Sequence, residues 1–185
     1  GIVPDMITCA KGISGGYVPL GAVLAHEKIL EEMNRHKSNI VTGHTYSAHH
    51  VIAASARAAV EYMLGNDLVQ KANENGKYLF ERMKSLLEDP IVGDVRGKGL
   101  FMGIEFVKNK ATKAPFDFSE KIADRIGAES LRRGLIVYPG SGSVDGTLGD
   151  HILLAPPLII SRSEIDQMAL ILEESIHHIA HQVVP

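Results

Sequence analysis

The sequence has one cysteine, no tryptophan, and only five phenylalanines and five tyrosines in 185 residues. A single cysteine, Cys9, excludes an internal disulfide bond and favours a reducing compartment, so we expect a cytoplasmic protein. No apolar run approaches the roughly 20 residues of a membrane-spanning helix, and we expect no membrane contact. The net charge is only -3, with both signs mixed along the chain, which gives no indication of nucleic acid as a partner.

Apolar residues make up 45% of the chain and charged residues 22%, the balance of a globular protein with a sizeable core. The length suits one ordinary domain or one and a half small ones. The chain begins with GIVPDM, which has neither an initiator methionine nor a signal peptide and leads directly into strand-like sequence. We therefore expect it to be part of a longer protein.

Hydrophobic periodicity predicts strands that alternate with helices, in a layered α/β or α+β fold. We expect short buried strands at 6–9 and 21–25 and further strands at 99–107, 135–138 and 151–155. We expect helices at 26–34, 47–63, 67–87 and 118–133, and a last helix after Ser161. Capping boxes begin two of them, Asp117-x-x-Glu120 and Ser161-x-x-Glu164. One glycine of the 99–107 strand marks a place where another backbone approaches.

Lys11 stands between a short apolar run and a segment with three glycines, Gly12, Gly15 and Gly16. An exposed lysine has a pKa of about 10.4 and is a poor nucleophile, whereas burial at a strand end lowers the pKa and leaves a neutral amine that can form a Schiff base with an aldehyde. Neighbouring glycines let a flat cofactor or its phosphate approach the backbone. Local composition alone favours a simpler interpretation, a lysine that caps a turn. A nucleotide P-loop is excluded because this lysine precedes the glycines.

Four segments resemble, in order, motifs of the class III pyridoxal-phosphate-dependent aminotransferases, with the omega-aminotransferase subgroup nearest. They are PDMITCAKGISGGYVPLGAVLAHEKI, GHTYSAHHVIAASARAA, VGDVRGKGLFMGIEFV and GDHILLAPPLIISRSEID. Family members are more than twice as long, so the resemblance covers their C-terminal half. It implies part of the aspartate-aminotransferase-like fold (fold type I). Residues 1–65 would be the rear of the large domain with the start of the inter-domain helix, and 66–185 the small α+β domain.

The resemblance also assigns roles to residues. Lys11 would hold pyridoxal 5'-phosphate as a Schiff base and then move the proton between substrate and cofactor. Thr45 would donate a hydrogen bond to the cofactor phosphate in the partner's site, which implies a homodimer with shared sites. The reaction would move an amino group from an amine or omega-amino acid to a 2-oxo acid. Arg96 would shape the packing of the strands in the small domain. Contact with the substrate is the second and less favoured alternative for this residue.

Three departures from the family qualify these roles. The glycine turn for the phosphate, the stacking aromatic residue and the acidic partner of the pyridine nitrogen all belong to the part upstream, so we expect the 185 residues alone to be inactive. Residues 139–150 contain no arginine to pair with a substrate carboxylate. His50 stands where the family often has proline. The lysine motif is shared with aminomutases, racemases and decarboxylating transaminases, and a non-catalytic dimerisation module stays open as well.

Other residues have simpler interpretations. His177 and His181 are four apart on the last helix and could hold a metal ion, but no third ligand lies near in the sequence and we expect no metal site. Tyr17 and Tyr46 either line the cofactor pocket or pack. Cys9 is expected to be a small core residue. The lysines of KNKATK (108–113) are expected to form a solvated loop.

Overall fold

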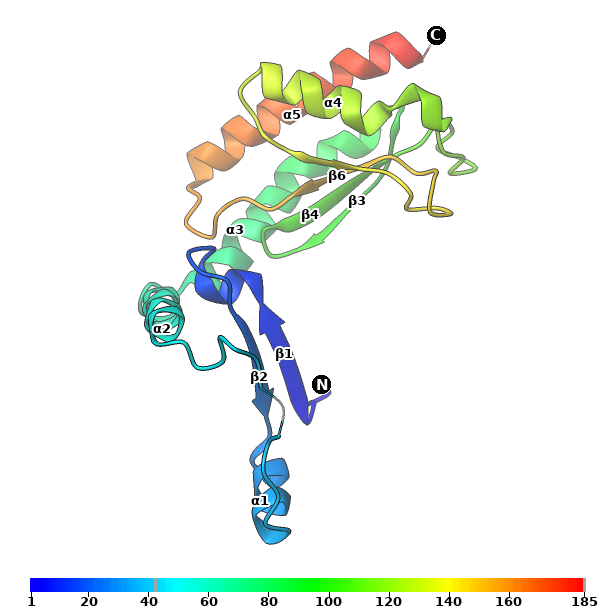
Figure 1. The fold of residues 1–185 in the computed structure, drawn as a ribbon. Coiled ribbons are helices and arrows are strands. Elements are labelled where there is room, and N and C mark those ends of the chain that lie inside the picture. Colours follow the sequence, from blue (N-terminus) through cyan, green and yellow to red (C-terminus); the bar gives the residue numbers. More distant parts are fainter. Residues whose placement is uncertain (42, 185) are drawn as a thin grey trace. The chain divides into compact units, whose positions relative to one another are not determined.

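The structure is a computed structural model that describes residues 1–41 and 43–184, and the chain divides into two compact units, Gly1–Asp67 and Leu68–Pro185. The first unit contains β1 (Met6–Ala10), the 3-10 helix η1 (Lys11–Ser14), β2 (Gly21–Ala25), α1 (Glu27–Arg35) and α2 (His50–Gly65) (Figure 1). The two strands are antiparallel, with Met6 opposite Ala25 and Ala10 opposite Gly21. The turn that joins them begins at Lys11, and η1 packs against α2.

The strands of this unit were expected to be buried, and that expectation is wrong for the chain as described. Ile7 is 50% exposed, Val23 67% and Leu24 53%, and Cys9 is half-buried rather than a core residue. The physical reason is that two strands form a single layer, whereas burial requires a second layer packed on it. Apolar composition indicates that a strand needs cover, but it does not say which segment provides it.

Helix α2 also differs from the prediction. It begins at His50 rather than at 47 because the chain first makes a turn in which Ala48 has φ +56°, outside the helical range. Its apolar residues suggested burial all round, yet Ala56 is its one buried residue within the part of the chain that the structure describes.

The second unit is a four-stranded antiparallel sheet with three α-helices on the same side of it (Figure 1). The strand order is β3-β4-β6-β5. Along β4, Met102, Ile104 and Phe106 are buried and the residues between them are not, the alternation of a sheet with one covered face. The elements in chain order are α3 (Leu68–Met83), η2 (Lys84–Glu88), β3 (Val92–Lys98), β4 (Phe101–Phe106), η3 (Phe118–Glu120), α4 (Ile122–Arg132), β5 (Tyr138–Gly140), β6 (His151–Leu154) and α5 (Arg162–Val183).

The last helix, α5, matches its prediction closely. Its capping box is present: the Ser161 hydroxyl accepts a hydrogen bond from the Glu164 backbone N–H at 3.3 Å, and the Glu164 carboxylate accepts one from the Ser161 N–H at 2.8 Å. Apolar residues at helical spacing then form one buried stripe. Full burial of one isoleucine, leucine or methionine side chain stabilises a fold by about 1.5–3 kcal/mol. The stripe consists of Ile165, Met168, Ala169, Leu172, Ile176 and Ile179.

Two predicted elements of this unit need correction, and one strand was not predicted. The sequence analysis missed β3, which pairs with β4 as a hairpin whose turn contains Gly99 at φ +57°. The predicted helix at 118–133 is interrupted at Lys121, where φ is +48°, so that α4 begins at Ile122. The segment 135–138 is not a strand except at its last residue. Leu135 and Val137 pack at the edge of the core without joining the sheet, and β5 starts at Tyr138.

A close approach of two backbones joins α3 to the β3–β4 turn at Gly99. The approach was expected at a glycine within the 99–107 strand, whereas Gly99 lies in the turn before β4. A Cβ added to Gly76 of α3 would lie 2.2 Å from the carbonyl carbon and oxygen of Gly99. Any side chain at position 76 would therefore push the helix away from the hairpin.

The lysines of the 108–113 loop are more engaged than expected. The Lys113 ammonium donates to the Gly93 carbonyl at 2.6 Å, and the Lys110 ammonium donates to the carbonyls of Leu87 and, at 3.0 Å, Asp89. These amines bind carbonyl oxygens of β3 and of the segment just before it, so the loop is tied to the sheet rather than freely solvated.

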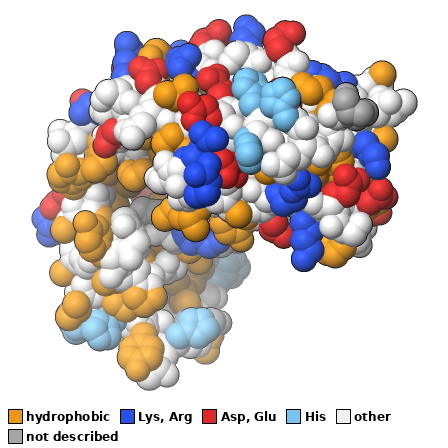
Figure 2. All heavy atoms as spheres, turned by 90° about the horizontal axis from the view of Figure 1, so that it is seen from above, with side chains coloured by type: hydrophobic (Ala, Val, Ile, Leu, Met, Phe, Trp, Pro, Cys, Tyr) orange, Lys and Arg blue, Asp and Glu red, His pale blue; other side chains and the backbone are white. Residues whose placement is uncertain are grey.

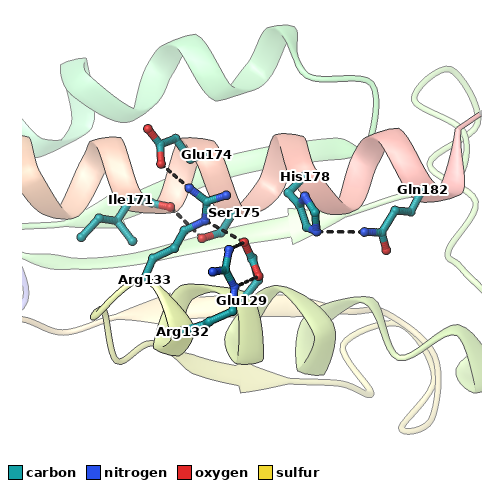
Figure 3. Close-up of polar contacts among 8 residues, drawn as sticks. All are labelled: Glu129, Arg132, Arg133, Ile171, Glu174, Ser175, His178 and Gln182. Atoms are coloured by element: carbon teal, nitrogen blue, oxygen red, sulfur yellow. Dashed lines mark hydrogen bonds and ion pairs between the residues drawn. The ribbon is translucent and has the colours of Figure 1, made fainter.

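A cluster of ion pairs links α4 to α5 (Figure 3). The Glu129 carboxylate accepts hydrogen bonds from Arg132 at 2.7 and 2.8 Å and from Arg133 at 2.7 Å, and Arg133 also donates to Glu174 of α5. The hydrogen bonds from Arg132 and then Arg133 lower the pKa of Glu129 to about 2. The carboxylate therefore stays charged at pH values well below the ordinary pKa of a glutamate.

We predict that Glu129→Gln destabilises the intact protein in a pH-dependent way. The pKa in the folded chain lies below the ordinary value of about 4.3, so the ion pairs contribute fully above that pH and their contribution is lost as the pH falls toward 2. Urea unfolding should show a clear deficit at pH 7 that shrinks between about pH 4.5 and pH 2. Glu81→Gln, which removes an exposed carboxylate 3.7 Å from Lys84, is the control and should have little effect. A deficit independent of pH would contradict the prediction.

Candidate active site

Lys11 lies where β1 ends and the glycine-rich turn begins. Its backbone has φ +54°, in the left-handed region, after Ala10 in an extended conformation. For a residue with a Cβ atom this conformation costs about 1–2 kcal/mol. The side chain is exposed in the structure, so the burial that we expected around this amine is not seen here.

The turn after Lys11 is held by hydrogen bonds and by contact with α2. The Ser14 hydroxyl donates to the carbonyl oxygens of Val18 at 2.7 Å and of Lys11 at 3.1 Å. The Gly15 N–H donates to the Gly12 carbonyl at 3.0 Å. Gly15 has φ +61°, and a Cβ added there would lie 3.8 Å from the Cβ of Ala59 on α2. The positive φ makes glycine the favoured residue for this turn, whereas the distance to Ala59 is an ordinary van der Waals contact.

A hollow lies beside the turn. Among its lining glycines, a Cβ added to Gly12, Gly16 or Gly21 would meet no atom within 4 Å. The backbone there is open to a flat ligand next to the Lys11 amine, which fits an aldehyde cofactor. The described residues that line the hollow include no acidic and no aromatic side chain. They are Ala10, Lys11, Gly12, Ser14, Gly16, Val18, Pro19, Leu20 and Gly21.

Thr45 lies in the turn that precedes α2 and is exposed. In that turn the His44 N–H donates to the Ser47 hydroxyl at 2.9 Å, and the Ser47 N–H donates to the His44 carbonyl at 2.9 Å. Thr45 belongs to the same unit as Lys11 but is absent from the described lining of the Lys11 hollow. Among the described residues of one chain, Thr45 therefore does not line the same hollow as Lys11.

Arg96 lies on β3 of the second unit. Its guanidinium pairs with Asp94 at 2.7 Å and with Glu105 of β4. The hydrogen bonds that Arg96 donates to these carboxylates, first to Glu105 and then to Asp94, raise the pKa of Arg96. Because two carboxylates already occupy this side chain, it serves the β3–β4 pairing, as the packing interpretation expected.

The arginine-free segment 139–150 is organised by two aspartates. Asp145 accepts hydrogen bonds from the N–H groups of Thr147 at 2.8 Å and Leu148 at 2.7 Å. The buried Asp150 accepts one from the Ala123 N–H at the start of α4, at 2.9 Å, and desolvation raises its pKa. These contacts are internal to the fold.

The remaining candidates do not form a site in the described chain. No group of three histidine, cysteine, aspartate or glutamate side chains that could hold a metal ion is found among residues 1–41 and 43–184. His177 lies 3.4 Å from Asp89 instead. Tyr17 is 84% exposed and Tyr46 74%, so neither packs into a core.

Surface charge and helix hydrophobicity can be compared with the expectation that neither nucleic acid nor a membrane is a partner. Lys and Arg side chains stand next to Asp and Glu on the face shown in Figure 2, without one large patch of either sign. Within the described ranges, no helix combines the length and the apolar character needed to cross a lipid bilayer.

We predict that Lys11→Gly is more stable than Lys11→Ala by about 1 kcal/mol, because glycine adopts φ near +54° without the Cβ penalty. At Lys77, an exposed residue inside α3, the order of the two variants should reverse by a similar amount. Denaturant unfolding of the four variants of the intact protein measures both differences. Equal stability of the two Lys11 variants would show that the backbone there is unstrained.

Comparison with known proteins supplies the family. The class III aminotransferase family (Aminotransferase class-III) matches residues 1–176. An uncharacterized aminotransferase of Schizosaccharomyces pombe is 43% identical over 181 residues, which cover 95% of this chain and 39% of the relative. The adenosylmethionine-8-amino-7-oxononanoate aminotransferase of Geobacter sulfurreducens is 35% identical over 180 residues, covering 96% and 38%.

Solved structures agree with this result. A transaminase from the marine bacterium Virgibacillus superposes with a TM-score of 0.90 at 31% identity, covering 98% of this chain and 41% of its own. An (S)-enantioselective omega-transaminase from Thermomicrobium roseum gives 0.82 at 38% identity, covering 100% and 38%. The chain thus spans about two fifths of the length of these proteins. Its fold is part of the fold type I transaminase fold, as the sequence predicted, and the chain belongs to the class III aminotransferase family.

Proposed function

We propose that the protein containing this chain is a pyridoxal-phosphate-dependent transaminase that moves an amino group from an amine or omega-amino acid to a 2-oxo acid. The observation that carries the proposal is the Lys11 amine beside a hollow of open glycine backbone, in a chain of the class III family. The single cysteine favours a reducing, cytoplasmic location for this enzyme.

Each residue of the site then has a task. Lys11 would hold the cofactor aldehyde through its Nζ atom and, as a free amine, would accept and return a proton at the same nitrogen. Gly12 and Gly16 leave room for the ring beside the backbone. When bound, pyridoxal phosphate supplies the electron sink for negative charge on the substrate carbon. Thr45 donates its hydroxyl to the cofactor phosphate of a partner subunit, so the active form is a homodimer.

Residues outside this chain complete the site. The described lining of the Lys11 hollow has no carboxylate to keep the pyridine nitrogen protonated and no aromatic ring to stack on the cofactor. Both groups are needed for the electron sink and for tight binding. We therefore assign them to the part of the protein that precedes the lysine motif.

We predict that Lys11→Ala in the full-length protein abolishes the visible absorption of bound pyridoxal phosphate and lowers transamination by at least about 1,000-fold, because no other amine replaces the nucleophile. Borohydride reduction followed by peptide mapping should place the phosphopyridoxyl label on Lys11 of the wild type.

The control is Lys37→Ala, since Lys37 is another exposed lysine of the first unit with positive φ, +49°. It should keep the chromophore, the label and the activity. A label on any other lysine would overturn the assignment. Product analysis separates transamination from an aminomutase, racemase or decarboxylating reaction, which use the same lysine.

We further predict that residues 1–185, purified alone and supplied with pyridoxal phosphate, do not catalyse transamination, because the groups assigned to the rest of the protein are missing. The full-length protein assayed with the same amine and pyruvate is the reference. Turnover by the isolated chain at a comparable rate would disprove the division of the site.

A further inference from the structure

We propose that Ser14 is a positioning residue that holds Lys11 in place for its reaction with the cofactor, an inference that rests on the function proposed above. The Ser14 side chain is 1% exposed, whereas the other residues from 10 to 21 are all at least partly exposed. A fully buried hydroxyl in an otherwise open segment needs hydrogen-bond partners. It has two, the carbonyl oxygens of Lys11 and Val18.

The two partners tie the ends of the turn together. Carbonyl oxygens only accept, so Ser14 is the donor in both contacts and its single proton is shared between them. The bond to Val18 is the shorter, at 2.7 Å, and that to Lys11 is 3.1 Å. Val18 leads back to β2 and Lys11 leaves β1. The hydroxyl thus links the lysine to the returning chain.

The hydrogen bond from the Ser14 hydroxyl constrains Lys11, the residue whose backbone is strained. Left-handed backbone at a residue with a Cβ persists only where its surroundings hold it. The 3-10 helix η1 contains Lys11 and Ser14, and two further backbone hydrogen bonds, Gly15 to Gly12 and Tyr17 to Ser14, hold the part of the turn beyond Lys11. The Ser14 hydroxyl reaches the Lys11 carbonyl itself. Without it, rotation about the Lys11 backbone would swing the amine, and a displacement of about 1 Å at a reacting atom costs roughly 100-fold in rate.

Ser175 provides a matched control for a role in stability alone. Its side chain is also fully buried, and its hydroxyl donates to the Ile171 carbonyl at 2.7 Å within α5 (Figure 3). Ser175→Ala removes the same kind of hydrogen bond as Ser14→Ala, but it leaves the Lys11 turn intact. Any effect of buried hydroxyl loss on stability is therefore common to both variants.

The experiment uses the full-length protein loaded with pyridoxal phosphate and measures how fast hydroxylamine displaces Lys11. In this step the hydroxylamine nitrogen bonds to the cofactor aldehyde carbon, the bond from that carbon to Nζ breaks, and two protons pass from that nitrogen to Nζ. The visible circular dichroism of the bound cofactor and the melting temperature are recorded for every variant. Wild type, Ser14→Ala, Ser14→Thr and Ser175→Ala are compared.

We expect Ser14→Ala to keep the borohydride label on Lys11, to change the circular dichroism of the cofactor, and to slow displacement by about 10- to 100-fold. Ser14→Thr, which keeps the hydroxyl, should restore the rate to within about threefold of the wild type, and Ser175→Ala should lower the melting temperature without changing rate or spectrum. If Ser14→Ala does not fold, Ser14→Cys, with its weaker donor, takes its place and should show an intermediate rate.

The inference is overturned if Ser14→Ala or its replacement matches the wild type in rate and spectrum, or changes them no more than Ser175→Ala does. Failure of the proposed function looks different, because the wild type itself would then show no cofactor band and no label on Lys11.

Discussion

The backbone torsion φ at Lys11 is the constraint around which the first unit is arranged. The chain must leave an extended strand, reverse direction and present an amine at the same residue, and the reversal is made in the left-handed region. Glycine would make this turn without strain but carries no amine. The strand pairing from Met6 to Ala10 on one side, the Ser14 hydroxyl on the other and the packing of α2 on η1 together hold the strained residue. Strain retained beside a reactive group is typical of functional sites.

In the second unit, charged side chains on and near the sheet form ion pairs and hydrogen bonds with other groups of the same unit. Arg96 pairs with carboxylates on its own strand and on β4, and Asp150 accepts a hydrogen bond from the first turn of α4. Lys110 and Lys113 bind carbonyls next to β3. These contacts join loops to the sheet and helices rather than to a ligand.

What the sequence predicted depends on how local the information is. The first turn and the buried stripe of helix α5 were predicted because the capping box and the helical spacing of apolar residues are both local sequence patterns. The strand β3 was missed because VGDVRGK has two glycines and charged residues that weaken its alternation. Leu135 and Val137 misled the analysis because apolar residues can pack on a core without joining a ladder. The role of Lys11 stays a prediction that rests on the resemblance, since its local composition also suits a solvated turn. Ser14 carried no signal of its own, because its role arises only when Val18 folds back beside it.

The hairpin of β1 and β2 has a consequence for handling the protein. Within the described residues each of these strands pairs only with the other, so each has an edge without a described strand neighbour, beside exposed Ile7, Val23 and Leu24. Such edges are templates for recruiting further strands from other molecules. A proteolytic cut or a premature release of this segment would therefore generate a species prone to aggregate, and charged substitutions at the exposed strand positions would be the direct way to keep it in solution.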